Sequence, residues 1–524
     1  MKKEADYAIP VRARSTFDTK VRSVGPDVRP IVWSIAGSDS GGGAGLQADL
    51  KALQAFGVHG CTAVAAITAQ NSVAVTRVEP VSAALLDAQL AALAQDMPPH
   101  AIKTGLLGSV DNVHVVCRWV DRLRENAAVQ GQSVALVVDP VLGATTGATF
   151  ADDAVLQAYM QELLPRATLI TPNHAEAQRL GLATSDAQQA LLARGVSIVI
   201  TGGDAADAQA SDWLQSPQAT GWLSLPRVAT HHHHGTGCTF ASTTAAALAS
   251  GYCVADAVVL AKMATTHALR HAYAAGQGAG PVQALPDFAQ HVHNLPAFTL
   301  PGAMAPLNLQ ALSTFAPLSH PALGVYAVVD SATWVRRVLA AGIRTVQLRI
   351  KDPTESTLAA QVQEAIAVAR ETPGAQLFIN DHWQLVLQHG AYGVHLGQED
   401  MESVDLNALR NAGVRLGLST HSYWEVARAW ALRPSYIACG PIFATQSKDM
   451  PWIPQGLDNL RYWAHVPPLP VVGIAGIGMH NMADVAATGV ASAAVITAIT
   501  QAANPDEACR SLMAAFAAGA HRND

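Results

Sequence analysis

The sequence of 524 residues contains few charged residues and no strong excess of charge of either sign. Only 14% of the residues are charged, and the formal net charge is −7. Domains that bind nucleic acid usually carry a basic surface, so this balance argues against nucleic acid as a partner. No uncharged apolar run reaches the roughly 18 to 20 residues that cross a bilayer, so we also expect no membrane span.

The chain has six cysteines, and no two of them stand at a C-x-x-C spacing. This argues against a structural zinc site and a disulfide framework, and it favours reduced thiols. Residues 1–30 carry scattered Lys and Arg but no apolar signal core, so we expect a disordered lead-in there and a cytoplasmic protein. The cysteines are Cys61, Cys117, Cys238, Cys253, Cys439 and Cys509.

Length and composition predict more than one domain. A chain of 524 residues is too long for a single core, and half of the residues are apolar, which suffices for two or three cores. Between residues 276 and 321 the periodicity fades and Gly and Pro become frequent, which discourages regular elements. We expect a linker over 276–321, with one short helix around residues 288–293, between a domain at 31–275 and a domain at 322–524.

The first domain alternates short apolar runs with helical patterns. This alternation predicts a mostly parallel sheet with helices on both faces, whose ligands lie beyond the carboxyl ends of the strands. Polar residues gather after several of the strands, although any one of them could be a loop cap. The expected strands are Ile31–Ala36, Cys61–Thr68, Ala101–Thr104, Val134–Val138, Thr168–Ile170 and Ser197–Thr201.

A glycine-rich turn, Gly37–Gly45, joins the first strand to a helix that starts at about Leu46. Such a turn lets backbone N–H groups approach a polar ligand closely. It is not a P-loop, because no Lys-Ser/Thr pair closes it, and it does not fit G-x-G-x-x-G. Alone it is more often just a tight connection.

The strongest signal of this domain is Gly235-Thr236-Gly237-Cys238, which opens a small-residue helix over Phe240–Ser250. Backbone N–H groups at the positive end of a helix dipole form an anion hole for a phosphoryl group in transfer. The same field should lower the thiol pKa of Cys238 and make it a base toward a substrate hydroxyl. The preceding run His231–His234 has no carboxylate or Cys partners spaced with it, which disfavours a native metal site.

As a set, these motifs resemble hydroxymethylpyrimidine (phosphate) kinase, of the ribokinase-like superfamily, over about residues 31–275. The segments that carry the resemblance are Gly37–Gly45, Gln47–Lys51, Ala69–Asn71, Asp139–Val141 and His234–Thr239. The resemblance implies a doubly wound sheet and ATP-dependent phosphorylation of a pyrimidine alcohol. It implies that the aminopyrimidine contacts Ala44, Asp49 and Gln70, with Leu106 and Val141 lining the pocket. It also implies that Asn173 and Glu176 serve Mg²⁺, and that Gly235, Thr236, Gly237 and Cys238 form the anion hole and base.

One position departs from the family pattern. The family usually carries a lysine before the Gly-Gly that follows the strand at 197–200, and this chain has Thr201-Gly202-Gly203. A missing cation at a phosphoryl-transfer site removes electrostatic stabilisation. Kinase turnover, particularly on the monophosphate, is therefore in question.

From Gly324 onward, short apolar strands alternate with Ala-rich helices. Eight such units in some 200 residues predict a TIM barrel, which gathers its functional residues at the carboxyl ends of the strands. The expected strands are Gly324–Asp330, Thr345–Ile350, Leu377–Asp381, Gly393–Leu396, Arg415–Ser419, Tyr436–Gly440, Val471–Gly476 and Ala493–Ala498.

Polar side chains follow most of these strands. Alternation within Thr345–Lys351 turns Gln347, Arg349 and Lys351 away from the apolar face, and two cations with an amide suit a diphosphate; a solvated edge strand is the alternative. Asp381 and Asp400, at neighbouring strand ends, would form a magnesium bridge to that diphosphate. The other candidates, at the remaining strand ends, are Asn380, Ser419, Thr445, Lys448, Gly476, Ile496 and Thr497.

This second pattern resembles thiamine phosphate synthase over Gly324 to about Ala515. The matching segments are Gln347-x-Arg349-x-Lys351, Asn380-Asp381, His395–Asp400, Gly440–Phe443 with Thr445 and Lys448, and Val472–Ile474 with Gly476. The resemblance implies two substrates, hydroxymethylpyrimidine diphosphate and a thiazole phosphate. Ala475 stands where the family often has Gly, and Thr497 where it often has Ser, so we expect a tuned thiazole site.

Together the two resemblances imply an enzyme that makes the pyrimidine diphosphate with ATP and Mg²⁺ and then couples it to thiazole phosphate. Two alternatives for the first domain stay open: a pyrimidine-binding sensor without activity, suggested by Thr201, and a thiazole kinase, which also carries a Gly-Thr-Gly-Cys turn. The expected partners are small molecules, and a homodimer is an open option.

Overall fold

The computed structural model describes residues 28–143, 150–203, 207–301, 314–352, 354–444 and 454–522. The described residues up to 301 form one compact unit, and those from 314 onward form a second. Each unit is described by itself below. Among the described residues, none of the helices has the length and apolar character that crossing a membrane requires.

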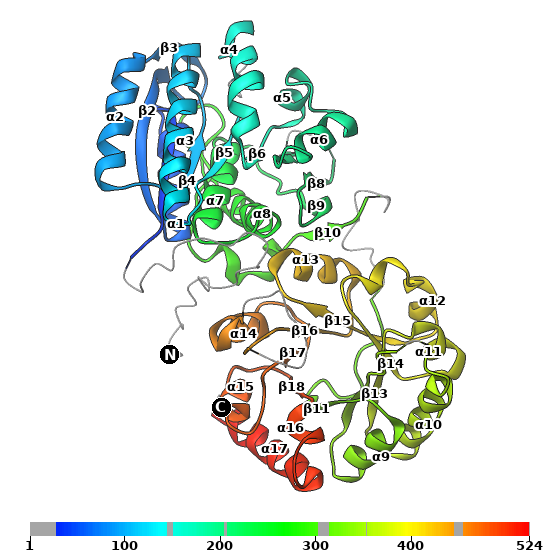
Figure 1. The fold of residues 1–524 in the computed structure, drawn as a ribbon. Coiled ribbons are helices and arrows are strands. Elements are labelled where there is room, and N and C mark those ends of the chain that lie inside the picture. The colour runs from blue at the N-terminus through cyan, green and yellow to red at the C-terminus, as the bar shows by residue number, and fades with distance from the viewer. Residues whose placement is uncertain are drawn as a thin grey trace. The chain divides into compact units, whose positions relative to one another are not determined.

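The first unit is built on one ten-stranded sheet with the order β10-β9-β8-β7-β6-β5-β4-β1-β2-β3 (Figure 1). The strands from β7 to β2 in this order run parallel, and antiparallel strands flank them on both sides. The strands are β1 Ile31–Gly37, β2 His59–Gln70, β3 Val75–Pro80, β4 Ala101–Thr104, β5 Ala135–Val138, β6 Leu169–Ile170, β7 Ser197–Ile200, β8 Gln209–Gln215, β9 Thr220–Pro226 and β10 Ala297–Thr299.

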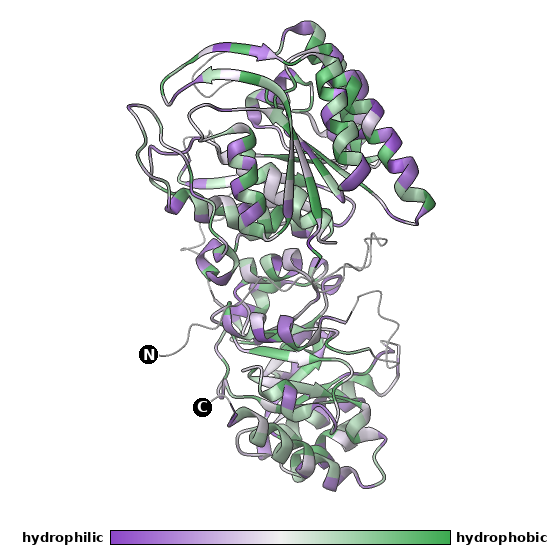
Figure 2. Cartoon of the chain, turned by 90° about the vertical axis from the view of Figure 1, so that its left-hand side faces the viewer, coloured by the Kyte–Doolittle hydropathy of each residue, from purple (hydrophilic) through white to green (hydrophobic). Residues whose placement is uncertain are grey.

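Helices cover both faces of this sheet. Trp33 and Ile35 of β1 face one core with helices α2 and α3, whereas Val32 faces the opposite core with α1 and α7. In Figure 2 the central strands of the sheet are largely hydrophobic, whereas the helices carry both hydrophobic and hydrophilic residues. The helices are α1 Gly45–Phe56, α2 Ala83–Asp96, α3 Val110–Val129, α4 Asp153–Ala158, α5 His174–Arg179, α6 Ser185–Leu192, α7 Thr236–Ala249 and α8 Val254–Arg270, with short turns η1 Tyr159–Leu163, η2 Leu164–Arg166, η3 Phe288–Gln290 and η4 Val292–Asn294.

The interval expected to be a linker contains regular structure. The short helix expected around residues 288–293 is present as the two turns η3 and η4, and β10 then pairs antiparallel with β9. Residues 276–301 thus belong to the first unit, while residues 302–313 lie outside the described part of the chain.

The second unit is a closed barrel of eight parallel strands in sequential order, β11 to β18. This confirms the predicted TIM barrel, with all eight strands at the expected places. The strands are β11 Gly324–Val329, β12 Thr345–Leu348, β13 Gln376–Asn380, β14 Gly393–Leu396, β15 Arg415–Thr420, β16 Tyr436–Cys439, β17 Val471–Ile474 and β18 Ser492–Val495.

Helices surround the barrel (Figure 1). Large side chains fill its interior. Tyr326, Phe378 and Tyr436 meet inside it, with ring centroids 5.1 to 6.0 Å apart. The interior is therefore a packed core, and ligands have access only at its ends. The helices are α9 Ala332–Ala340, α10 Leu358–Glu371, α11 Trp383–His389, α12 Leu406–Asn411, α13 Tyr423–Leu432, α14 Gly456–His465, α15 Met482–Ala486, α16 Thr497–Thr500 and α17 Pro505–Ala520, with the turn η5 Asp400–Glu402.

Candidate active sites

The first unit holds a pocket of about 720 Å³ beyond the carboxyl ends of its parallel strands. This is where an open α/β sheet binds its ligands. The pocket brings together most of the residues expected there: Ala44, Gln70, Leu106, Val141, Asn173, Glu176, Thr201, Gly235, Thr236, Gly237 and Cys238.

Asp39 organises the glycine-rich turn. Its carboxylate accepts hydrogen bonds from the N–H groups of Gly41, Gly43 and Ala44 at 2.8 to 2.9 Å, and its Oδ2 lies 3.0 Å from Nε2 of His234. Burial acts to raise the pKa of Asp39, but these hydrogen bonds, led by that of His234, outweigh it and hold the pKa below its usual value. The turn is thereby tied to the segment that precedes α7.

Asp49 was expected to contact the aminopyrimidine, but it does not line the pocket. Its side chain has no exposed area, and its carboxylate accepts hydrogen bonds from Lys103 Nζ, Ser34 Oγ and Ser242 Oγ at 2.6 to 3.0 Å. Lys103 also lies 3.4 Å from Asp139, and both of these residues line the pocket. The role of Asp49 in this geometry is to hold Lys103 in place, and Lys103 presents the charge.

Lys103 was missed at the sequence level, although a signal existed. It is the single charged residue in the buried strand Ala101–Thr104, and a buried ammonium group needs carboxylate partners. Its partners come from a helix 54 residues earlier and from the loop after β5, so they could be identified only in the fold.

The expected low pKa of Cys238 is wrong for this pocket. Cys238 does lie in the first turn of α7, where the Lys103 ammonium and the N–H of Gly45 favour a thiolate. Burial is the larger effect, and together with the carboxylates of Asp49 and Asp139 it raises the pKa of the thiol to about 12. Cys238 is therefore a neutral thiol at neutral pH.

Asn173 and Glu176 form a capping box at the start of α5. Asn173 Oδ1 accepts from the N–H of Glu176, and Glu176 Oε2 accepts from the N–H of Asn173, both at 2.9 Å. The box fixes two oxygen-bearing side chains at the pocket wall, and oxygen is the donor atom that Mg²⁺ prefers.

Among the described residues, two cations that line the pocket with Thr201 are both bound to other groups. Arg227 donates to the carbonyls of Gly202, Gly203, Asp207 and Gln209, and Lys262 Nζ lies 2.8 Å from Asp212 Oδ2. These two cations line the pocket but are already engaged in holding the loop after β7.

The anion-hole turn depends on a glycine at one position and tolerates a side chain at another. Gly235 has φ 85°, and a Cβ there would lie 2.0 Å from the carbonyl oxygen of Gly43, whereas a Cβ at Gly237 would meet nothing within 4 Å. We expect Gly235→Ala to destabilise the first unit by about 2 kcal/mol or more, because both the backbone conformation and the contact are unfavourable. Gly237→Ala, the matched control, should not lower stability. Thermal unfolding of both variants tests this, and equal midpoints would contradict it.

The carboxyl ends of the barrel strands gather the second set of candidate residues. Asn380 ends β13 and donates to Asp381 at 2.5 Å, while Gly397 N–H donates to Asp400 Oδ2 at 3.0 Å. Burial, followed by the charge and hydrogen bond of Asp400, raises the pKa of Asp381, and Arg349 opposes this rise. Two carboxyl groups that face each other beside an arginine suit a divalent cation bridging to a diphosphate.

A buried polar chain crosses the barrel beneath this mouth. Gln347 Nε2 donates to Tyr326 OH at 3.4 Å, the hydroxyls of Tyr326 and Tyr436 lie 2.9 Å apart, and His395 contacts Tyr436 OH and Ser419 Oγ at 2.7 and 2.9 Å. Burial, aided by the nearby Arg349, lowers the pKa of His395 to about 3, so this imidazole is neutral. This series of hydrogen bonds holds Gln347 and Ser419 in place, and both are expected substrate residues.

Sequence reasoning did not find Tyr326 and Tyr436, because their inward orientation depends on which face of each strand the barrel encloses. The signal was weak: a hydroxyl-bearing aromatic within β11 and another at the first residue of β16.

The last two strands end in turns that face the same mouth. Ala475 and Gly476 have φ 78° and 67°, and Ile496 caps the short helix that begins at Thr497. The left-handed backbone at Ala475 accounts for the glycine that the family often has at this position. Lys351 is exposed just beyond β12, and Thr445 and Lys448 lie outside the described residues.

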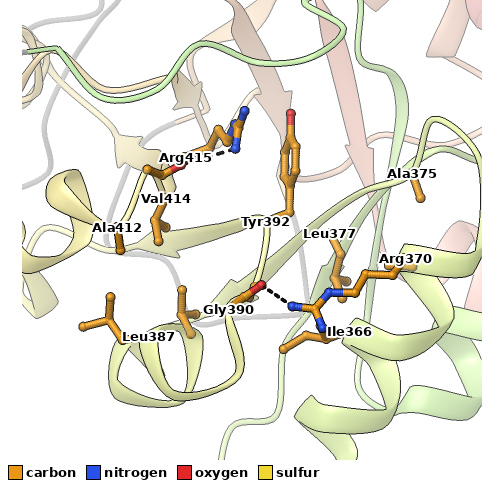
Figure 3. A pocket seen from close by; sticks show the side chains of 14 residues that line it. Ile366, Arg370, Ala375, Leu377, Leu387, Gly390, Tyr392, Ala412, Val414 and Arg415 are labelled. Atoms are coloured by element: carbon orange, nitrogen blue, oxygen red, sulfur yellow. Dashed lines mark hydrogen bonds between the residues drawn. The ribbon is translucent and has the colours of Figure 1, made fainter.

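A further cavity, of about 380 Å³, opens at the other end of the barrel (Figure 3). It is lined by Leu377 and Arg415, near the first residues of β13 and β15, and by Arg370. Its arginines already donate to backbone carbonyls, Arg370 to Gly390 at 2.8 Å and Arg415 to Gly413 at 3.2 Å. Barrel enzymes place their chemistry at the carboxyl ends of the strands, so this cavity is not part of the candidate site.

Comparisons with known proteins assign each unit to a family pattern. Residues 39–283 match phosphomethylpyrimidine kinase, and residues 325–499 match thiamine monophosphate synthase. A chloroplastic protein of Oryza sativa subsp. japonica, described as a probable thiamine biosynthetic bifunctional enzyme, is 33% identical over 482 residues, which cover 88% of this chain and 83% of that protein.

Two further relatives match one unit each. The thiamine-phosphate synthase of Enterobacter sp. (strain 638) is 52% identical over 198 residues, or 38% of this chain and 93% of the relative. The crystal structure of phosphomethylpyrimidine kinase from Clostridium difficile 630 is 29% identical, covers 46% of this chain and 100% of that chain, and has a TM-score of 0.39.

Proposed function

The chain belongs to the family of bifunctional thiamine biosynthetic enzymes, and from this premise we propose which residues carry out each of its two reactions. The first unit is a phosphomethylpyrimidine kinase, and the second is a thiamine phosphate synthase. The kinase phosphorylates hydroxymethylpyrimidine and its phosphate to the diphosphate with ATP. The synthase couples this diphosphate with thiazole phosphate and releases diphosphate.

In the kinase pocket, the N–H groups of Gly235, Thr236 and Gly237 receive the transferred phosphoryl group. They open a fourteen-residue helix, so its dipole adds to their hydrogen bonds. Lys103 adds a fixed positive charge that Asp49 holds in place. Mg²⁺, held near Asn173 and Glu176, would neutralise phosphate charge when bound.

Cys238 receives the proton of the substrate hydroxyl late in the reaction, and it does so as the thiolate, which is a small fraction of the enzyme at neutral pH. Phosphoryl transfer proceeds through a loose transition state, in which the attacking oxygen becomes acidic only as its bond to phosphorus forms. The raised pKa makes the thiolate scarce but strongly basic, and that thiolate accepts the proton at the stage when the hydroxyl has become acidic. Gln70 and Ala44 orient the pyrimidine, and Leu106 and Val141 pack against its ring.

In the synthase, the residues at the barrel mouth stabilise the departing diphosphate. Arg349 and Lys351, with Lys448, which follows β16 in the sequence, balance its negative charge, and Mg²⁺ held by Asp381 and Asp400 would do so as well. The electron-rich aminopyrimidine carries the positive charge that remains on the methylene carbon. Little acid–base work is then asked of the protein, and catalysis consists mainly of placement and charge stabilisation.

The remaining residues of the mouth place the two substrates. Gln347, Asn380 and Ser419 hold the pyrimidine part, and the buried chain through Tyr326, Tyr436 and His395 supports two of these three. Gly476, Ile496 and Thr497 bind the phosphate of the thiazole through backbone N–H groups, as the last two loops of such barrels commonly do. Thr445, which follows β16 in the sequence, completes this set.

The observation that carries the proposal is the arrangement at the barrel mouth, where Asp400 and Arg349 lie close enough to Asp381 to shift its pKa. The direct test supplies the pyrimidine alcohol, ATP, Mg²⁺ and thiazole phosphate to the whole chain. We expect thiamine phosphate to form, and omission of ATP should stop it unless the pyrimidine diphosphate is added. If thiamine phosphate forms from added pyrimidine diphosphate but the pyrimidine alcohol is not phosphorylated, the first unit would be a pyrimidine-binding sensor without activity.

The match to phosphomethylpyrimidine kinase favours a pyrimidine substrate over the thiazole alternative for the first unit. A competition assay between the two alcohols decides between them. Preferential phosphorylation of the thiazole alcohol would overturn our assignment.

A lysine at position 201 is expected to accelerate the kinase. Thr201 lines the pocket and pairs with Asn173, and the neighbouring Arg227 and Lys262 are engaged elsewhere. A positive charge at this point stabilises the transferring phosphoryl group, so Thr201→Lys should raise kcat on the monophosphate by about tenfold or more. Thr201→Met adds length without charge and serves as the control. Equal rates of the two variants would show that charge at this position is unimportant.

A further inference from the structure

A cluster of histidines and one aspartate lies in the first unit, and neither proposed reaction uses it. His267 stands in the last turn of α8, Asp287 precedes η3, and His291 lies between η3 and η4. One potential ligand atom from each of the three lies within 4.8 Å of the others. Asp287 connects them, with Oδ1 3.0 Å from His267 Nε2 and Oδ2 3.1 Å from His291 Nε2.

More imidazoles surround the three residues. The ring centroid of His271 lies 4.4 Å from that of His267, and the centroid of His293 lies 5.2 Å from that of His291. The side chain of His267 is only 2% exposed, whereas those of Asp287 and His291 are 44% and 38% exposed. The cluster therefore has one buried anchor and an opening to solvent through which an ion can enter.

We propose that His267, Asp287 and His291 bind Zn²⁺ or a similar divalent transition-metal ion. Two imidazole nitrogens and one carboxylate oxygen are a common zinc ligand set, and water or a neighbouring imidazole completes four-coordination. Mg²⁺ is disfavoured, because it prefers oxygen donors. The site is separate from the sequence run His231–His234.

Asn294 supplies the second shell. Its Nδ2 lies 3.2 Å from Nδ1 of His267, and its Oδ1 is buried with no hydrogen-bond partner in the described part of the chain. Rotation of this amide by half a turn would let Oδ1 accept from Nδ1–H and leave the Nε2 lone pair of His267 for the metal, as is usual for metal-bound histidines. The rotation breaks the 2.9 Å bond from Nδ2 to the carbonyl of Phe288, so we expect affinity in the low-micromolar range.

The bound ion would link the end of α8 to the segment that leads into β10. Helix α8 contributes Lys262, Thr265 and Thr266 to the wall of the kinase pocket. A metal ion that binds the folded state and not the unfolded state stabilises the fold. The ion therefore has a structural role, and the readouts that test it do not depend on enzyme activity.

The experiment uses the full chain without an affinity tag, stripped of metal, with His231→Ser and His233→Ser to remove the exposed histidines of the run. Zn²⁺ is titrated against a chromophoric chelator, and Co²⁺ is added separately to read its visible absorption. We expect one equivalent of Zn²⁺ and a tetrahedral Co²⁺ spectrum. Asp287→Asn and His291→Gln, which conserve shape, should each weaken binding at least about tenfold.

His59→Gln, at an exposed position on β2, is the matched control and should bind as tightly as the parent. Circular dichroism of each variant confirms that it is folded. Zn²⁺ binding that is unchanged in both Asp287→Asn and His291→Gln would overturn the proposal, as would absence of binding in the parent.

Discussion

Asp381→Ala is expected to lower the rate of thiamine phosphate formation by about a thousandfold or more and to leave phosphorylation of the pyrimidine unchanged. Asp381 faces Asp400 beside Arg349 at the barrel mouth, and both of these groups act on the pKa of Asp381. Loss of one carboxylate removes half of the proposed magnesium bridge, and stabilisation of developing charge is usually the largest catalytic contribution. The measurement follows coupling from added pyrimidine diphosphate and ATP consumption in separate assays.

Two further variants serve as comparisons for Asp381→Ala. Lys351→Ala should also abolish most coupling, because it removes a cation proposed to balance the diphosphate. Glu371→Ala removes an exposed carboxylate from the last residue of α10, which lies toward the amino ends of the strands, and should leave coupling intact. Simultaneous loss of both activities in Asp381→Ala would mean that the two units do not work independently.

Cys238→Ala is expected to slow the kinase by about 10²- to 10⁴-fold, the usual contribution of a general base. Because the pKa of the thiol is raised to about 12, the wild-type kcat/KM should climb with pH, by up to about tenfold per unit, through at least pH 9. The sign follows from the thiolate being the reactive form: its fraction grows until pH reaches the pKa. The alanine variant should lack this slope.

Cys238→Ser separates basicity from hydrogen bonding. Serine places a hydroxyl in the first turn of α7, but the pKa of a hydroxyl is higher than that of a thiol. We therefore expect Cys238→Ser to recover only a small part of the rate that Cys238→Ala loses. The pH profile of kcat/KM, measured with the pyrimidine phosphate and saturating ATP, is the decisive readout. A wild-type plateau from neutral pH upward would mean that the thiol ionises readily and that the burial argument fails.

The barrel was predictable because its strands are short apolar runs, and because closure in sequential order leaves no choice of which ends meet. Arg349, Asp381 and Asp400 could be assigned to one mouth from the sequence for this reason. The parallel strands of the first unit were predictable for the same reason. Strands β8 and β9 were not, since Gln209–Gln215 and Thr220–Pro226 mix polar and apolar residues without clear alternation.

Protonation states could not be read from the sequence. The helix position of Cys238 alone predicted a low pKa, but burial and two carboxylates from distant segments reverse the shift. Asp49 likewise looked like a ligand contact until Lys103 and Ser242 were found around it. Local position suggests that a residue is important, whereas its role depends on neighbours that only the fold brings together.

The pairing of β10 with β9 has a practical consequence for anyone who wishes to express the kinase alone. A chain that stops at residue 275 would lack Ala297–Thr299 and leave the backbone of Trp222–Ser224 without its partner strand. Open strand edges recruit other chains and promote aggregation. A chain that ends after Thr299 retains the pairing of β10 with β9. Insolubility of a shorter fragment would therefore say nothing about whether the kinase can fold without the synthase.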